Sequence, residues 1–239
     1  MARIDDLLSA ALKSLPVKPA DTASQSEKKH YSELVSQKVA LAVAEELRRR
    51  GLNETRPAGE SGAERRMAGG LGAKKVDVTW TTAESGLLLA ISVKTINFRD
   101  SKMKNFQKNL PNRRSDMLME AVTLHRRFPY AVLGGLFFLD KGAETDGTGK
   151  RRSTFENAHT RLQLFTGRND PAGREDQFER LYLILLDASP KSVFLRPYAV
   201  GDAVHELGMS EILDDLLKLV AQRNPDFYEF EDGNLQRAP

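Results

Sequence analysis

The chain has 239 residues, of which 40% are hydrophobic and 29% charged, and its formal net charge is +3. This composition is ordinary for a globular protein that buries its own core. No cysteine is present, so disulfides, thiolate metal sites and cysteine nucleophiles are excluded. No stretch has the length of a transmembrane helix, and the N-terminal segment is a short amphipathic stretch, not a signal peptide. We therefore expect a cytoplasmic protein with no membrane partner.

The basic residues are grouped along the chain. They cluster at Arg48–Arg50, between Lys102 and Arg114, and at Lys150–Arg152, whereas acids gather between Glu211 and Asp232. This distribution can present one positive face to phosphate groups. It can equally be a set of solvated surface runs, and the charge pattern alone favours that interpretation.

Two N-terminal segments have apolar residues at helical spacing. They predict a short helix over residues 4–15 and a long helix over 27–50 that ends at Gly51. Residues 1–26 are expected to form an N-terminal helix and linker. Residues 53–73 are rich in Gly, Ala and charge without periodicity, which predicts a mobile loop.

Two strand patterns follow this loop. Residues 75–82 alternate apolar with polar side chains, residues 87–95 form an apolar run, and the turn residues 83–86 separate them. The pair predicts a hairpin with one fully buried strand. A polar, basic loop is predicted over 97–112 and a helix over 113–127.

The second half of the chain continues to mix helices and strands. Its predicted elements are a strand over 130–139, a Gly-rich charged loop over 140–152, a helix over 153–165 with a Ser153–Glu156 capping box, strands over 181–186 and 192–197, and a helix over 202–223 with Gly208 as a candidate break. The tail from Pro225 is expected to pack loosely. This order predicts an α/β fold with a mixed central sheet and helices on both faces. The main domain is expected over 27–200, with 201–239 packed on it.

Polar side chains interrupt the two strands of the predicted hairpin. Because side chains alternate faces along a strand, Ser92 and Lys94 are expected to share a face with Leu88 and Ala90. Asp77 interrupts the apolar alternation of the neighbouring strand, where a carboxylate is a poor strand former. If the strands pair, Asp77 and Lys94 converge on one face.

Each of these residues has a purely structural interpretation. Lys94 can extend its amine out of the end of the strand, and Asp77 can face water. The functional alternative is phosphodiester hydrolysis, in which carboxylates hold Mg²⁺ and a lysine orients or activates the attacking water and offsets developing charge. That chemistry needs a second carboxylate.

Two helices can supply the second carboxylate. Glu120 lies on or beside the apolar face of the helix over 113–127, where an unpartnered glutamate is costly. Glu33 lies early in the long N-terminal helix, with Gln37 one turn later. Both are candidates to reach Asp77.

Asp77 followed by the Ser92-Val93-Lys94 triplet resembles the PD-(D/E)XK nuclease superfamily, which includes many type II restriction endonucleases. Val76 stands where the motif has proline, and Ser92 stands where it has an acid. The likeness covers residues 27–140. It implies a restriction-endonuclease-like fold, Mg²⁺ with Mn²⁺ as a substitute, and a Ser-Val-Lys variant in which Glu120, from the following helix, completes the metal site.

Under this resemblance the catalytic residues are Asp77, Ser92, Lys94, Glu120 and Glu33, with Asp77, Glu120 and Glu33 as metal ligands. The polar basic stretch that follows the triplet suits double-stranded DNA, because basic side chains contact phosphates and Asn, Gln and Arg can read base edges. The residues predicted to bind DNA are Lys102, Lys104, Asn105, Gln107, Lys108, Asn109, Arg113 and Arg114. None of the four histidines has metal-ligand spacing, and His125 is predicted to pack at a helix surface.

Three functions follow from this sequence. The first is a restriction or phage-defence endonuclease that acts as a homodimer to cut both DNA strands. The second is a catalytically inactive DNA-binding or assembly subunit with the same fold, which the serine at position 92 favours. The third is an interaction protein whose long helices pair with another chain.

Overall fold

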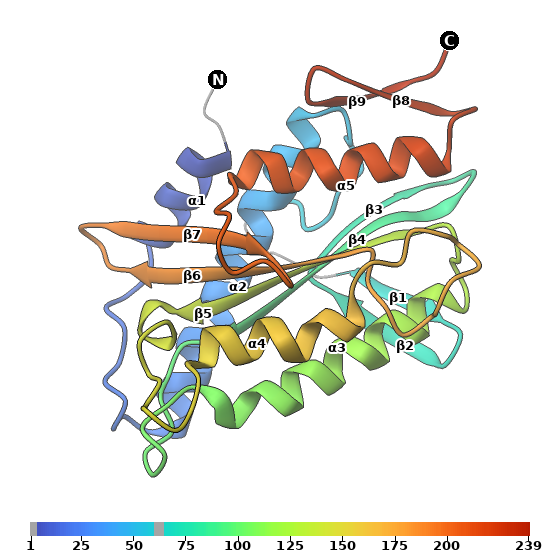
Figure 1. Ribbon diagram of the computed structural model, residues 1–239. Coiled ribbons are helices and arrows are strands. Elements are labelled where there is room, and N and C mark those ends of the chain that lie inside the picture. The colour runs from blue at the N-terminus through green and yellow to red at the C-terminus, as the bar shows by residue number, and fades with distance from the viewer. Residues whose placement is uncertain (1–3, 60–64) are drawn as a thin grey trace.

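The computed structural model of the chain describes residues 4–59 and 65–239, and its elements are shown in Figure 1. The α-helices are α1 (Ile4–Lys13), α2 (Gln25–Arg49), α3 (Leu110–His125), α4 (Thr154–Leu162) and α5 (Met209–Arg223). The strands are β1 (Arg65–Gly69), β2 (Gly72–Val76), β3 (Val78–Thr82), β4 (Gly86–Ile96), β5 (Val132–Asp140), β6 (Arg180–Ala188), β7 (Val193–Ala199), β8 (Tyr228–Glu231) and β9 (Asn234–Arg237). Short 3₁₀ turns cover Gln107–Asn109, Lys141–Ala143 and Gln163–Phe165.

The centre of the fold is a five-stranded sheet of order β3-β4-β5-β6-β7. β4, β5 and β6 run parallel, and the two outer strands, β3 and β7, are antiparallel to their neighbours. The predicted α/β class with a mixed central sheet is confirmed. Among the described residues, no helix combines the length and the apolar character that a membrane span needs.

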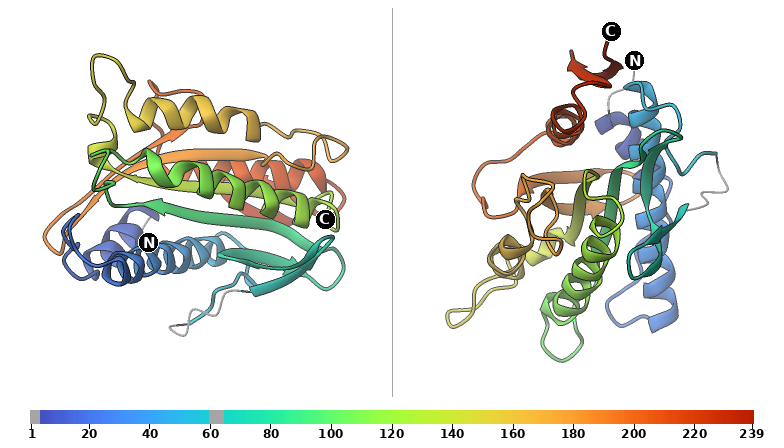
Figure 2. Two further views of the ribbon diagram at one scale, coloured as in Figure 1. Left: turned by 90° about the horizontal axis from the view of Figure 1, so that it is seen from below. Right: turned by 90° about the vertical axis from the view of Figure 1, so that its right-hand side faces the viewer.

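Helices cover both faces of this sheet, as Figure 2 shows. One apolar cluster joins the inner faces of α1, α2 and α5 to one side of the sheet, and a second joins α3 to the other side. The helix α4 and the β1–β2 hairpin lie on the α3 side. The helix α4 begins at the predicted Ser153–Glu156 capping box. The long helix α2 begins two residues earlier than predicted, at a capping box of Ser24 with Glu27.

Two details of the predicted β3–β4 hairpin are wrong. The first strand is interrupted by a bend at Asp77, so residues on its two sides belong to β2 and β3. A bulge opposite Trp80 inserts Leu88 as an extra residue in β4. Leu88 therefore packs in the cluster of α1, α2 and α5 rather than beside Ala90, because a bulge reverses the alternation of faces.

The predicted loop over 53–73 also contains structure. Its second half belongs to the antiparallel β1–β2 hairpin, which packs on α3 through Met67. Residues 60–64 of that segment lie outside the described residues. Each of these strands has only five residues, which is too short to show a clear alternation of apolar and polar side chains. The sequence therefore did not predict them.

The C-terminal region differs from the prediction in two places. The last helix begins at Met209, with Gly208 as its N-cap, and the segment from 202 to 207 is not helical. The tail does not pack loosely: β8 and β9 form a hairpin whose Tyr228 and Leu235 are buried in the main cluster. Leu235 also donates its backbone N–H to Arg50 O, at 2.9 Å, which ties the tail to the end of α2.

Candidate active site

Three charged side chains meet on the face of the sheet that α3 covers. The ammonium Nζ of Lys94 lies 3.3 Å from Glu120 Oε2 and 3.7 Å from Asp77 Oδ2. Asp77 comes from the bend between β2 and β3, Lys94 from β4 and Glu120 from α3. The predicted convergence of Asp77 with Lys94 is present, and Glu120 joins them as a second carboxylate.

A backbone hydrogen bond holds Asp77 in place. The N–H of Val93 donates to Asp77 Oδ2 at 2.7 Å. The ladder between β3 and β4 is continuous only from Val78 and Ile91 onward, so the Asp77 carboxylate takes over a donor that a longer β3 would have paired. The bend that interrupts the strand thus directs this carboxylate at β4.

Glu120 is buried, with 1% of its surface exposed. Its Oε2 accepts hydrogen bonds from Lys94 Nζ and from Ser92 Oγ, both at 3.3 Å. Ionised groups usually form shorter hydrogen bonds, of about 2.7–2.9 Å. The carboxylate is therefore held in position by two partners, but neither contact is at the optimal distance.

The same contacts set the ionisation of the cluster. Burial raises the pKa of Glu120, the positive charge of Lys94 opposes that rise, and the negative charge of Asp77 adds to it. Burial also acts to lower the pKa of Lys94, but the attraction of Glu120 and Asp77 is larger in sum, and the pKa of Lys94 is raised. Lys94 is thus a stable cation between two carboxylates.

Ser92 is part of this cluster, although its side chain carries no charge. It is 1% exposed, shares a face with Lys94, and donates its hydroxyl to Glu120. At this position it orients Glu120, whereas an acid here would add a third carboxylate beside Lys94.

Glu33 lies apart from these residues. Its side chain on α2 is 63% exposed, and its contact among the described residues is an ion pair with Lys29 at 3.7 Å. Gln37, one turn later, is also exposed. The described contacts do not connect either residue with Asp77, Lys94 or Glu120, so α3 rather than α2 delivers the second carboxylate.

The predicted basic loop after β4 is a folded turn. Asp100 Oδ1 accepts from the N–H groups of Lys102 and Met103, at 3.0 and 2.8 Å, and Asp100 N–H donates to Asn105 O. Side-chain hydrogen bonding to Lys108, with these backbone donors, lowers the pKa of Asp100 to about 2. The acid in the loop is therefore engaged with the loop itself, and Lys102 is left exposed.

The residues predicted to bind DNA fall into two groups. Asn105 is 3% exposed and its side chain bonds Met103 O and Gln107 N–H, so it serves the turn and is not accessible to a base. Gln107 and Arg114 are half-buried, and the Arg114 guanidinium lies over the Phe165 ring. The exposed members are Lys102, Lys104, Lys108 and Asn109, together with the partly exposed Arg113.

The basic cluster Arg48–Arg50 does not form an open positive face. Arg48 and Arg49 both pair with Glu45. Arg50 is buried and binds Glu46 and Asp214, at 2.8 and 2.5 Å, which joins α2 to α5. These cations are structural.

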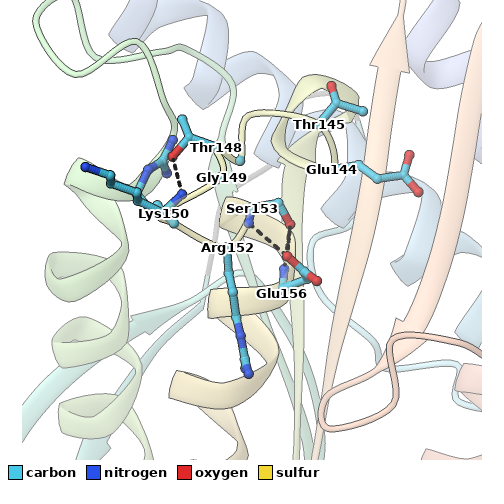
Figure 3. A pocket seen from close by; sticks show the side chains of 10 residues that line it. Glu144, Thr145, Thr148, Gly149, Lys150, Arg152, Ser153 and Glu156 are labelled. Atoms are coloured by element: carbon cyan, nitrogen blue, oxygen red, sulfur yellow. Dashed lines mark hydrogen bonds between the residues drawn. The ribbon is translucent and has the colours of Figure 1, made fainter.

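A surface hollow of about 660 Å³ lies in the Gly-rich segment before α4 (Figure 3). Lys150 and Arg152 extend from it in different directions, and Glu156 is turned back onto Ser153 in the capping box (Figure 3). The described cations around it do not point to a common ligand position, so the cluster of Asp77, Lys94 and Glu120 is the better candidate.

Two features near the site were not predicted. Lys74 on β2 is close enough to Glu120 for its charge to oppose the rise in that residue's pKa. It was missed because it fell between the predicted loop over 53–73 and the predicted strand over 75–82. The second is a buried network around Glu179, which includes His125 from the end of α3. Its members are far apart in the sequence, and no local pattern links them.

The donor set suits one kind of metal. Mg²⁺ is commonly held by one or two carboxylates, with waters and substrate phosphates as its other ligands, and Asp77 and Glu120 provide two hard-oxygen ligands that both lie within 3.7 Å of Lys94 Nζ. Within residues 4–59 and 65–239, no group of three or more His, Cys, Asp or Glu residues could form an all-protein cage. The arrangement therefore fits Mg²⁺ or Mn²⁺ with open positions, and not a closed structural site.

Comparison with known proteins adds no family to this geometry. The chain matches no family model, no curated protein and no solved structure.

Proposed function

We propose that this chain is a Mg²⁺-dependent endonuclease that hydrolyses DNA phosphodiester bonds. The observation that carries the proposal is the buried Glu120, which α3 delivers to within 3.3 Å of Lys94 beside Asp77. A buried carboxylate is costly unless it is paired or bound to a metal. Two carboxylates that meet a lysine, here one from the β2–β3 bend and one from α3 beside Lys94 of β4, are the set that metal-assisted phosphodiester hydrolysis needs.

Each side chain has a distinct role in this proposal. Asp77 and Glu120 hold the ion, which when bound polarises the scissile phosphate and lowers the pKa of a water ligand. Lys94 keeps its proton, orients the attacking water and offsets charge that develops on the phosphate oxygens. Ser92 orients Glu120, and the N–H of Val93 orients Asp77.

A restriction or phage-defence role, in the cytoplasm and as a homodimer that cuts both strands, extends this proposal to the biological setting. The resemblance of Asp77, Ser92 and Lys94 to the PD-(D/E)XK pattern supports it. A dimer is the simplest way to present two such sites to the two strands of a duplex.

One observation favours a second candidate, a DNA-binding or assembly subunit without chemistry. The Lys94 ammonium already stands between the two carboxylates, and it offsets part of their negative charge without a metal. In this candidate the cluster is a structural ion pair, and DNA binding depends on salt but not on divalent cations.

The experiment that separates the two is cleavage of duplex DNA with Mg²⁺ or Mn²⁺, by the wild type and by Asp77→Ala and Lys94→Ala. We expect metal-dependent cleavage by the wild type and none by either variant, with both variants folded by circular dichroism. Lys38→Ala, a half-buried lysine on α2, is the matched control and should cleave like the wild type. Salt-dependent binding without cleavage in any metal would favour the second candidate, and cleavage by both variants would sink the proposal.

A further inference from the structure

Lys74 lies on the side of the β1–β2 hairpin that faces α3. Its cross-strand partner is Met67, and residues that pair across strands or stand two apart on one strand share a face. Met67 and Val76 are both buried in the cluster that contains the inner face of α3. The half-buried Lys74 between them is thus directed toward α3.

The hairpin is fixed on α3 by direct backbone contact. Gly70 N–H donates to Thr123 O at 2.8 Å. A Cβ added at Gly69 would stand 2.4 Å from Thr123 Cγ2, so the two backbones approach more closely than a side chain would permit. Figures 1 and 2 show the hairpin beside α3. The position of Lys74 relative to Glu120 is therefore set by packing.

Arg113 lies on the other side of Glu120 along the same helix. They are seven positions apart, which is about two turns and about 10 Å of helix, on one face. Its ion pair is with Asp116 at 3.7 Å, and 40% of its side chain is exposed. Lys74 makes no hydrogen bond or ion pair among the described residues, and neither cation is used to hold the fold.

Both cations act on the central cluster. The charge of Lys74 is felt by Glu120 and that of Arg113 by Lys94. The candidate site therefore has a negative centre, made by Asp77 and Glu120 around Lys94, and one positive group at each end. This order of charges, positive, negative and positive, matches three successive phosphates of a DNA strand. The central phosphate would bind through a metal, and each neighbouring phosphate would bind a cationic side chain directly.

We infer that Lys74 and Arg113 bind the phosphates on the two sides of the scissile one, so that the site takes an internal linkage of a strand that runs along α3. The inference rests on the proposed nuclease function and specifies its substrate. Phosphate contacts fix the register of a strand, and a mononucleotide or a chain end would lack one of the two. Endonucleolytic cleavage follows from this placement.

The test is a double-mutant cycle between protein cations and DNA charges. The substrates are duplexes in which one phosphate beside the mapped cut is replaced by a neutral methylphosphonate, on the 5′ or the 3′ side. The proteins are the wild type, Lys74→Gln and Arg113→Gln. The matched controls are Lys75→Gln, the next residue of β2, which alternates to the other face, and Arg127→Gln, just beyond α3, whose guanidinium lies over the Phe128 ring.

We expect each neutral phosphate to slow cleavage by the wild type about ten-fold, equivalent to ~1.4 kcal/mol. Lys74→Gln should be insensitive to neutralisation on one side and Arg113→Gln on the other, while both controls keep both sensitivities. Full sensitivity to both sides in both variants would overturn the inference, and so would release of mononucleotides from DNA ends by the wild type. The first outcome would leave the proposed endonuclease function standing, whereas the second would also contradict its endonucleolytic part.

Binding gives a readout that does not depend on cleavage. In the absence of divalent metal, Lys74→Gln and Arg113→Gln should each reduce the slope of log affinity against log salt by about one, and the controls should leave it unchanged. If the wild type binds but does not cleave, the nuclease function has failed, and reduced slopes would then support only the phosphate contacts of Lys74 and Arg113. Unchanged slopes in both variants, or no DNA binding by the wild type, would refute the inference.

Discussion

Two buried carboxylates, Glu179 and Glu120, have opposite environments. Glu179 Oε1 accepts from Arg168 and Arg223, at 2.8 and 2.7 Å, and Oε2 accepts from Leu133 N–H at 2.7 Å and contacts His125 Nε2 at 3.3 Å. Glu120 has two partners, both at 3.3 Å and both on one oxygen. The first carboxylate is closed by its neighbours, and the second is left able to take a further ligand.

The difference also appears in ionisation. Burial acts to raise the pKa of Glu179, but the hydrogen bond and charge of His125, then Arg223 and the Leu133 N–H, are larger in sum, and the pKa is lowered. Around Glu120 burial is the larger influence, and its pKa is raised. A buried carboxylate whose two oxygens both have close donors serves the fold. A buried carboxylate that lacks some of its donors can take a metal or a substrate as a further ligand.

The largest expected effect comes from Glu179→Gln. The substitution leaves the guanidinium groups of Arg168 and Arg223 buried without their anion, which should lower the free energy of unfolding by about 3–5 kcal/mol. Urea denaturation measures it as a lower midpoint. Glu175→Gln, which breaks an exposed ion pair with Arg126 on the same side of the molecule, is the control and should cost less than about 1 kcal/mol. Equal losses of unfolding free energy in the two variants would show that the buried Glu179 network stabilises the fold no more than an exposed ion pair does.

Glu120→Gln should have the reverse profile. It keeps the size of the side chain and removes a metal ligand, so cleavage should fall by more than about 100-fold, the upper end for losing an outer partner of a metal site. The urea midpoint should stay close to that of the wild type, because the lost group was incompletely paired. A large fall in stability without a change in cleavage would show that Glu120 is structural, like Glu179.

How far the sequence foresaw these two clusters depends on how local each one is. Alternation along β4 is a local pattern, and it predicted that Lys94 meets Asp77 if the two strands pair. Helical spacing made Glu120 one of two candidates for the second carboxylate, and the other candidate, Glu33, is exposed and pairs with Lys29 instead. The Glu179 network joins residues from three distant segments through tertiary packing, which no local period encodes. Leu88 was misplaced for a related reason, because a bulge depends on the partner strand.

The two carboxylates should also give pH effects of opposite sign. The folded-state pKa of Glu120 is raised, so the folded protein holds that proton more tightly, and its contribution to stability is present below the unfolded pKa and lost as pH rises through the folded one. The lowered pKa of Glu179 has the opposite consequence: its contribution is present above the unfolded value and lost as pH falls through the folded one. In EDTA, Glu120→Gln should therefore gain stability relative to the wild type as pH rises above the ordinary glutamate pKa of 4.5. Glu179→Gln should lose stability relative to the wild type as pH rises toward 4.5 from below. If the free energies of unfolding of the two variants, each relative to the wild type, changed with pH in the same direction, the opposite pKa shifts of Glu120 and Glu179 would be contradicted.

The smallest expected effect is that of Ser92→Ala. It tests whether the hydrogen bond from Ser92 to Glu120 sets how well Glu120 binds Mg²⁺. The substitution removes one of the two hydrogen bonds to Glu120 Oε2 but leaves both carboxylates and Lys94 in place. Cleavage at low Mg²⁺ should fall about ten-fold, as for loss of a single outer contact to a metal ligand, and high Mg²⁺ should restore most of it. Ser92→Thr, which keeps the hydroxyl, should retain near wild-type Mg²⁺ dependence. A fall in rate that no Mg²⁺ concentration recovers would show that Ser92 acts on the reacting phosphate instead of on Glu120.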